Sequence, residues 1–179
     1  MEQLLMSRDD KNADLLQLQL PDGYFIRSYN EGDGIGWCKC CIDGDLGVEE
    51  ISESVFKKIM LDDSSVDPDN IFFLIAPSGD IAGTVTYQHT DDENKGCIHM
   101  VGIEKNYLGK GLAAPLNSYA VKRMIDDGKK YIVLKTDDWR IPAIKTYLRI
   151  GFSPVINEGD TDMSDRWEKV MEQININNR

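Results

Sequence analysis

The chain of 179 residues has only two histidines and four cysteines, and it is short of positive charge. Its 20 Lys and Arg residues stand against 31 Asp and Glu residues, which leaves a net charge of −11 with neutral histidines. This excess of acid disfavours general binding to nucleic acid, because the phosphate backbone repels it. No apolar run approaches the roughly 18 residues that span a bilayer. Residues 1–16 carry acid where an export signal carries a basic stretch and an apolar block. We therefore expect a cytoplasmic protein that binds neither nucleic acid nor membrane.

Three of the four cysteines crowd together at Cys38, Cys40 and Cys41. A zinc site needs two pairs of Cys or His ligands at defined spacings, and Cys97 with the two histidines does not supply the second pair. Small buried thiols on a helix are the better interpretation, and free thiols suit a reducing compartment. No metal site is expected.

The charge is distributed unevenly along the chain. Between Glu104 and Gly151 there are ten basic and five acidic residues, a local charge of +5, and the remainder carries −16. A basic middle within an acidic shell suits a protein that binds one anionic and one cationic molecule. The alternative is that the acid only keeps the protein soluble.

Length and hydrophobic periodicity predict one mixed α/β domain, residues 21–179, preceded by an arm, residues 1–20, that packs onto it. The expected strands are residues 24–29, 71–76, 81–87, 97–103, 131–134, 152–156 and 167–170. The expected helices are residues 32–41, 52–60, 111–127 and 142–150.

The strongest signal of function is a glycine-rich turn between the expected strand 97–103 and the expected helix 111–127. Backbone N–H groups at a helix start have no partner within the helix, and the helix dipole adds positive charge, so such a turn favours a phosphate. Gly109 and Gly111 allow close approach of the anion, and Lys110 adds charge.

Three types of phosphate loop compete for this turn. A Walker A motif requires Gly-Lys followed by Ser or Thr, which Gly109-Lys110-Gly111 does not provide. The dinucleotide fingerprint tolerates Ala114 at its third position but lacks the acidic residue that should follow. The third type is an acyl-CoA loop.

Two motifs carry a resemblance to a known family. Leu108-x-x-Gly111-x-Ala113 resembles the Gln/Arg-x-x-Gly-x-Gly/Ala loop of the GNAT superfamily of acetyl-CoA-dependent N-acyltransferases. The family's later block, Ala-x-x-x-Tyr-x-x-x-Gly-Phe, is matched at Ala143, Tyr147, Gly151 and Phe152. The order and spacing of both motifs agree with the family.

The resemblance implies an α/β (α+β) GNAT-type acyltransferase fold. Such a fold has a central, mixed, mostly antiparallel twisted sheet of six to seven strands, flanked by about four helices. The resemblance is clearest over residues 71–152, where residues 81–84 are similar to the family's third strand. Residues 21–27 are similar to its first strand, so one domain over residues 21–175 is implied.

The resemblance also implies acetyl-CoA as cosubstrate. Val101, Gly102 and Ile103 would hold the pantetheine through backbone bonds at a bulge and offer an N–H to the oxyanion. The implied pyrophosphate loop consists of Leu108, Gly109, Lys110, Gly111, Leu112 and Ala113. Leu108 replaces the family's usual polar residue, and Arg140 replaces a frequent Asn, where it would lose a CoA contact or bind a phosphate instead.

Amide formation requires that an ammonium group lose a proton and that the leaving thiolate be stabilised. By resemblance, Tyr147 occupies the general-acid position near the sulfur. His99 is the first candidate for the base, although it could equally be a histidine packed on the sheet and bonded to backbone. Glu104 is a second candidate.

Several further polar groups are candidates for the acceptor side. Asp91, Asp92 or Glu93 could act as the base through water. Asp137 and Asp138 could meet a cationic acceptor, or could only favour the start of the next helix. Trp139 follows them at the end of an expected strand, where α/β sites gather, and Cys97 is a weaker candidate for a thiol role.

The function we expect is transfer of an acetyl group from acetyl-CoA to a primary amine by direct attack in a ternary complex. A cationic acceptor, such as a polyamine, an aminoglycoside or a basic peptide terminus, is a hypothesis that rests on the overall acidity. One alternative is a non-catalytic acyl-CoA sensor of the same fold, and another is a nucleotide-binding protein with the same turn. A homodimer is compatible with a domain of this size.

Overall fold

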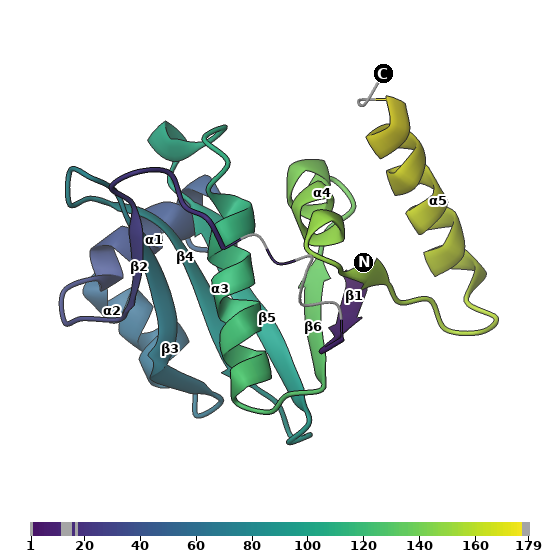
Figure 1. Ribbon diagram of the computed structural model, residues 1–179, viewed down its shortest axis with the longest axis horizontal. Coiled ribbons are helices and arrows are strands. Elements are labelled where there is room, and N and C mark those ends of the chain that lie inside the picture. Colours follow the sequence, from purple (N-terminus) through teal and green to yellow (C-terminus); the bar gives the residue numbers. More distant parts are fainter. Residues whose placement is uncertain (1, 12–15, 17, 177–179) are drawn as a thin grey trace.

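The computed structural model describes residues 2–11, 16 and 18–176 and has a seven-stranded sheet at its centre (Figure 1). The strands are β1 (Leu4–Asp9), β2 (Phe25–Ser28), β3 (Val66–Ile75), β4 (Ile81–His89), β5 (Lys95–Ile103), β6 (Tyr131–Thr136) and β7 (Ser153–Pro154). The α-helices are α1 (Gly34–Asp43), α2 (Glu53–Phe56), α3 (Ala113–Asp126), α4 (Ile141–Arg149) and α5 (Thr161–Ile176). A π-helical turn, η2 (Lys57–Leu61), extends α2, and a 3₁₀ turn, η3 (Lys105–Tyr107), precedes α3.

The strands follow the order β2-β3-β4-β5-β6-β1-β7. Neighbouring strands pair antiparallel except β5 and β6, which run parallel. A parallel pair needs a crossover connection, and α3 provides it. The prediction of a mixed, mostly antiparallel sheet is therefore confirmed, and the described residues contain one more α-helix than the four expected.

Helices cover the two faces of the sheet unequally. Side chains from α3, α4 and α5 form one core with Leu74, Val85 and Leu134 of the strands. Side chains from α1 and α2 form a second, smaller core on the other face, against β3. Figure 1 shows α3 crossing one face of the sheet, with α5 at the end beyond β1.

The first strand lies inside the sheet, which corrects the expectation of an arm packed onto the domain. β1 pairs antiparallel with β6 from Leu4↔Thr136 to Asp9↔Tyr131, and with β7 on its other side. Its side chains alternate between buried and half-buried, so one face of the strand contributes to the core. Residues 12–15 and 17 of the expected arm, and 177–179 of the expected domain, lie outside the described residues.

The last element is a helix, so the prediction of a closing strand at residues 167–170 is wrong. These residues lie within α5, where Trp167 and Val170 are buried together with Met163 and Ile174. Their spacings of four, three and four residues place all four on one helical face. The other expected elements are present with shifted ends, and the strand expected at 152–156 is reduced to β7.

The crowded cysteines lie on α1, as expected. Cys38, Cys40 and Cys41 are free thiols and fully buried. Burial raises the pKa of the Cys40 thiol to about 12, with smaller contributions from nearby carboxylates. Burial also raises the pKa of the Cys41 thiol, so Cys40 and Cys41 stay protonated. All three cysteines act as small apolar side chains.

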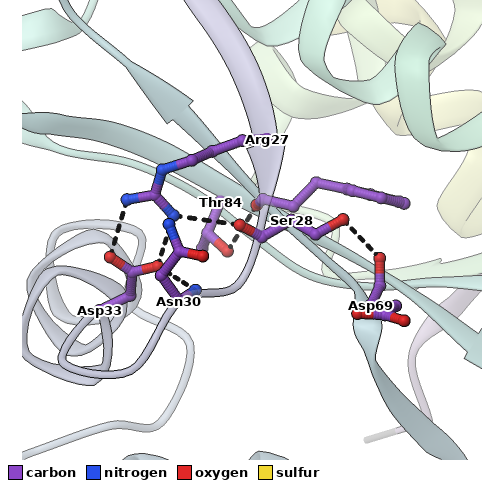
Figure 2. A network of polar contacts seen from close by, with 7 residues as sticks. Arg27, Ser28, Asn30, Asp33, Asp69 and Thr84 are labelled. Carbon is purple, nitrogen blue, oxygen red and sulfur yellow. Dashed lines mark hydrogen bonds and ion pairs between the residues drawn. The ribbon is translucent and has the colours of Figure 1, made fainter.

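A polar network fixes the connection between β2 and α1 (Figure 2). The Arg27 guanidinium binds the Asp33 carboxylate through two hydrogen bonds of 2.6 and 2.9 Å. The same carboxylate accepts a 2.7 Å hydrogen bond from the backbone N–H of Asn30. The Ser28 hydroxyl donates to the Asp69 carbonyl oxygen at 2.7 Å. The bidentate ion pair therefore holds the start of α1 against the edge of the sheet.

Candidate active site

The parallel strands β5 and β6 separate partway along their length. Their pairing runs from Lys95↔Tyr131 to Ile98↔Leu134, and β5 then continues to Ile103 without pairing to β6 among the described residues. A cavity of about 1590 Å³ occupies this region, lined by both strands, by α3 and α4 and by the loop after α1. Ordinary small-molecule pockets measure about 300–1,000 Å³, so the cavity suits a long ligand.

A β-bulge lies on β5 beside the cavity. Met100 and Val101 both stand opposite Val85 of β4, where a regular ladder would have one residue. Met100 has a positive φ of 49°, which is uncommon for a residue with a side chain. A bulge leaves one residue out of the ladder and bends the strand. The bulge expected from the resemblance is therefore present, and Val101 and Ile103 line the cavity.

Gly102 faces α1 rather than the cavity. It is buried, and a Cβ added to it would lie 2.7 Å from the carbonyl carbon of Cys40. This close approach of the α1 backbone explains the glycine at this position. Gly102 is not among the cavity-lining residues, so its expected contact with a cosubstrate would have to come from its backbone.

The glycine-rich turn lies at one end of the cavity. Gly109 and Gly111 are exposed, have φ values of 74° and 73°, and leave open space where a side chain would be. The Lys110 ammonium lies 4.7 Å from the centre of the Tyr107 ring and does not line the cavity. The members of the predicted loop that do line it are Leu108, Gly109, Gly111, Leu112 and Ala113. Free N–H groups at the start of α3 therefore adjoin this end.

Tyr147 of α4 borders the cavity from within the core. It is only 6% exposed, and its ring packs against Phe152 with centroids 6.1 Å apart. Its hydroxyl makes no hydrogen bond to any residue that the structure describes. Burial raises its pKa to about 12, so the group keeps its proton at neutral pH and can donate it to a ligand.

His99 lines the same cavity from the other face of the sheet. Along β5, Ile98 is buried in the core beneath α3, so His99 and Cys97 point to the opposite face. Burial lowers the pKa of the His99 imidazole, and the Asp63 carboxylate opposes this shift in part. His99 is therefore neutral at neutral pH and able to accept a proton.

Glu104 is placed differently from the other catalytic candidates. Its carboxylate accepts hydrogen bonds from the backbone N–H of Asn106, at 2.9 Å, and from the Asn106 side-chain amide, at 2.8 Å. It caps η3 and lies outside the lining of the cavity. Because these hydrogen bonds occupy its carboxylate, Glu104 is poorly placed to accept a proton from an amine in the cavity.

Arg140 binds the protein itself rather than standing free. Its guanidinium donates to the carbonyl oxygens of Gly44, at 2.7 Å, and Asp45, at 2.5 Å, and to the Asp137 carboxylate at 2.8 Å. It also stacks on Trp139, with the guanidinium carbon 4.3 Å from the ring centre. These bonds link α4 to the loop after α1, and Arg140 also lines the cavity.

Both aspartates after β6 are engaged in ion pairs. Asp137 binds Arg140, and Asp138 binds Arg166 of α5 through two hydrogen bonds of 2.9 and 2.5 Å. The Arg166 guanidinium lowers the pKa of the Asp138 carboxyl. Asp138 therefore anchors α5 to the loop before α4.

Sequence reasoning missed two polar side chains in the cavity wall. Asn117 of α3 and Thr136 at the end of β6 are buried, and each lines the cavity. Each carries an oxygen without a hydrogen-bond partner in the described part of the chain. The sequence does carry a signal for them, because each is a polar residue on an otherwise apolar face. Asn117 comes four residues after Ala113, and Thr136 comes two residues after Leu134.

The profile of the acetyltransferase (GNAT) family matches residues 48–152, which span the bulged strand, the turn and α4. The chain belongs to this family. Over 95 residues it is 30% identical to a mycothiol acetyltransferase of Corynebacterium aurimucosum, covering 49% of this chain and 31% of the relative. A mycothiol acetyltransferase of Streptomyces avermitilis is 24% identical over 167 residues, covering 91% of this chain and 52% of the relative.

The fold has counterparts among solved structures. A GCN5-related N-acetyltransferase from Sphaerobacter thermophilus superposes with a TM-score of 0.68 at 19% identity, covering 87% of this chain and 50% of that one. The chain thus spans about half the length, or less, of these relatives. The GNAT-type α/β fold expected from the resemblance is confirmed.

The described part of the chain lacks two other kinds of site. Over residues 2–11, 16 and 18–176, no helix is both long enough and apolar enough to cross a membrane. Within the same residues, His, Cys, Asp and Glu side chains form no group of three or more that could hold a metal ion.

Proposed function

We propose that this chain transfers an acetyl group from acetyl-CoA to a primary amine by direct attack in a ternary complex. The observation that carries the proposal is the cavity at the β5–β6 separation, in a chain of the acetyltransferase (GNAT) family. Its lining joins the turn at Gly109–Gly111, the bulged strand and Tyr147. The curated relatives compared above are themselves named acetyltransferases.

The two ends of the cavity suit the two ends of acetyl-CoA. The exposed turn and the first N–H groups of α3 suit the pyrophosphate, because they offer donors and a positive dipole end. The deeper end, where Tyr147 is buried, suits the thioester. A cosubstrate that spans both would pass along Val101 and Ile103 of the bulged strand.

Catalysis would proceed by attack of the neutral amine on the thioester carbonyl carbon. The C–N bond forms, the tetrahedral intermediate collapses, and the C–S bond breaks to release CoA. His99 would accept the proton of the amine, directly or through water. The Tyr147 hydroxyl would donate a hydrogen bond or its proton to the leaving sulfur.

The protonation of Cys97, a thiol in the cavity lining, favours direct attack over an acyl-enzyme intermediate. Cys97 lines the cavity, but burial raises its pKa. The two flanking lysines, Lys95 and Lys135, oppose this shift only in part. A protonated thiol is a poor nucleophile, so Cys97 is a neighbour of the reaction rather than its carrier.

A cationic acceptor remains the hypothesis for the amine. Asp45, Asp91 and Asp92 are exposed carboxylates that line the cavity, while Glu93 does not line it. Together with the net charge of −11, they favour approach of a cation. Asp137 and Asp138 contribute less, because each is already paired with an arginine.

The test is an acetylation assay with acetyl-CoA and one amine from each of three classes: spermidine, an aminoglycoside and a peptide with a basic free N-terminus. Release of CoA thiol and the mass of the product are followed. We expect acetylation of at least one of these amines. Turnover of anionic amino acids alone would overturn the cationic acceptor, and acetyl-CoA binding without turnover of any amine would favour the non-catalytic sensor.

A further inference from the structure

Two buried oxygen atoms in the cavity wall have no hydrogen-bond partner in the residues that the structure describes. They are Oδ1 of Asn117 and Oγ1 of Thr136. Asn117 is 1% exposed and Thr136 is 3% exposed, and both side chains line the cavity. A buried polar atom without a partner is destabilising and usually has a bound water or a ligand to explain it.

The orientation of the Asn117 amide is fixed by its own helix. Its Nδ2 donates a 2.8 Å hydrogen bond to the Ala113 carbonyl oxygen, one turn earlier on α3. The amide nitrogen is therefore engaged, and Oδ1 is left as a pure acceptor. An acceptor attracts an N–H or O–H group and repels a phosphate oxygen, so this atom cannot serve the phosphate end of a ligand.

Thr136 lies on the side of the sheet that also bears α3. It follows Ile132 and Leu134 at alternate positions of β6, and both of those side chains belong to the core beneath α3. Its hydroxyl can donate or accept a hydrogen bond. Asn117 and Thr136 thus come from two elements, α3 and β6, that both line the cavity, as Tyr147 of α4 does.

Among residues 2–11, 16 and 18–176, the other buried polar side-chain atoms without a hydrogen-bond partner lie elsewhere. They belong to Trp37, Thr86 and Trp167, and none of these residues lines the cavity. Thr86 stands next to His99 on the ladder of β4 and β5, with its side chain fully buried. It therefore offers a matched control for Thr136, with the same chemistry at a buried position outside the cavity lining.

We propose that Asn117 and Thr136 bind the amide groups of the pantetheine arm of acetyl-CoA. The inference rests on the proposed function and adds two side-chain ligands to the backbone contacts of the bulged strand. Asn117 Oδ1 would accept from an amide N–H of the arm, and the Thr136 hydroxyl would donate to an amide carbonyl. The acetyl group has no N–H, and the nucleotide end belongs at the exposed turn, so the arm is the part of the cosubstrate that matches both atoms.

The test compares two ligands on two variants by titration calorimetry. Acetyl-CoA carries the pantetheine arm, and 3′-phospho-ADP is the same nucleotide without it. We expect Asn117→Leu and Thr136→Val each to raise the Kd of acetyl-CoA by about five- to tenfold, the effect of one lost hydrogen bond. The Kd of 3′-phospho-ADP should remain unchanged in both variants.

The ligand-free proteins supply an independent readout. Thr136→Val should raise the melting temperature, because valine replaces a hydroxyl that lacks a partner with an apolar group of the same shape. Thr86→Val should do the same without changing the Kd of either ligand. If Asn117→Leu fails to fold, Thr136→Val still decides the proposal, because the substitution conserves shape.

Several results would overturn the proposal. An unchanged Kd for acetyl-CoA in Thr136→Val would show that the Thr136 hydroxyl does not bind the cosubstrate. If a variant lost affinity equally for acetyl-CoA and 3′-phospho-ADP, its effect would be indirect. Weaker binding of acetyl-CoA with unchanged binding of CoA would place the contact at the acetyl group instead. A wild-type protein that does not bind acetyl-CoA would refute the proposed function together with the arm contacts. A wild-type protein that binds acetyl-CoA, with an unchanged Kd in both variants, would refute the arm contacts alone.

Discussion

The guanidinium of Arg140 donates a 2.7 Å hydrogen bond to the carbonyl oxygen of Gly44, a residue 96 positions earlier in the chain. A second bond reaches the carbonyl oxygen of Asp45. The start of α4 is thereby tied to the loop after α1, and Gly44, Asp45 and Arg140 all line the cavity. Because its guanidinium is engaged with these carbonyl groups, we expect Arg140 to hold the loop after α1 rather than a phosphate of the cosubstrate.

Replacing Arg140 should therefore affect the acceptor more than acetyl-CoA. We expect Arg140→Ala to raise the KM of the amine about five- to tenfold, because charge-assisted hydrogen bonds to the loop are lost. The Kd of acetyl-CoA and its dependence on salt should stay within about twofold of wild type. Arg123→Ala, which removes an exposed arginine from α3, is the control. A weaker and less salt-dependent acetyl-CoA complex would instead show that Arg140 binds a phosphate.

Tyr147→Phe should lower kcat without weakening acetyl-CoA binding. The hydroxyl makes no hydrogen bond to the residues described, so its removal leaves folding nearly unchanged. Loss of a general acid costs about 10²–10⁴ in rate, and we expect a drop of about 100-fold or more. Steady-state kinetics with a melting curve provide the measurement. Tyr131→Phe, at an exposed tyrosine outside the cavity, is the control; a kcat that matches it would exclude Tyr147 as the acid.

The pH dependence of kcat/KM tests His99. Burial lowers the pKa of its imidazole below the ordinary 6.5, and only the neutral form can accept a proton. Activity should therefore fall as the pH drops through that lowered pKa and stay level above 6.5. In His99→Gln, most of the activity should be lost, and the remaining kcat/KM should no longer fall at acidic pH. In His89→Gln, the activity and its fall at acidic pH should both be retained. An unchanged fall at acidic pH in His99→Gln would exclude His99 as the base.

The same shift predicts how stability depends on pH. Because the folded protein holds the His99 pKa below its unfolded value, the unfolded chain binds the proton more readily, and stability falls as the pH drops below about 6.5. The lowered pKa of Asp63 acts in the same direction at more acidic pH, below about 4. Urea unfolding between pH 4 and pH 8 measures the slope. His99→Gln should flatten it above pH 5, and an identical slope would contradict this assignment.

Replacing either of two glycines of β5 by alanine should lower the stability of the fold, but by different amounts. A Cβ at Gly102 meets the backbone carbonyl group of Cys40, whereas a Cβ at Gly96 meets the flexible sulfur end of Met124. We expect Gly102→Ala to lower the free energy of unfolding by about 1–3 kcal/mol. Gly96→Ala should cost less, because Met124 can move. Equal losses in urea unfolding would contradict the close packing of α1 on the bulged strand.

Much of the site could be predicted because its signals are local. The turn at Gly109 and Gly111 lies within a single strand–turn–helix unit, where both glycines need a positive φ. Tyr147 sits in a short motif that ends with a glycine and Phe152. Such features depend on neighbours in sequence. The turn could therefore be predicted from its glycines, and Tyr147 from the resemblance of its motif to the family.

The misplaced elements depend on contacts between distant residues. β1 is short, and it forms a strand because its backbone pairs antiparallel with β6, which lies more than 120 residues later in the chain. Residues 167–170 begin with aromatic Trp167 and end with β-branched Val170, which resembles a short strand, but Met163 and Ile174 extend the helical period. The partners of Arg140 were equally beyond the reach of local spacing, since Gly44 and Asp45 meet it only in the folded chain.

Binding of acetyl-CoA is the central requirement, and thermal unfolding in the presence of acetyl-CoA, ATP and NAD tests it directly. At a concentration 100-fold above Kd, a ligand stabilises the native state by about 2.7 kcal/mol, which corresponds to a rise of about 5–10 °C in melting temperature for a chain of this size. We expect this rise with acetyl-CoA and not with ATP or NAD. A rise with ATP or NAD alone, or no rise with acetyl-CoA at any concentration, would contradict acetyl transfer at this cavity.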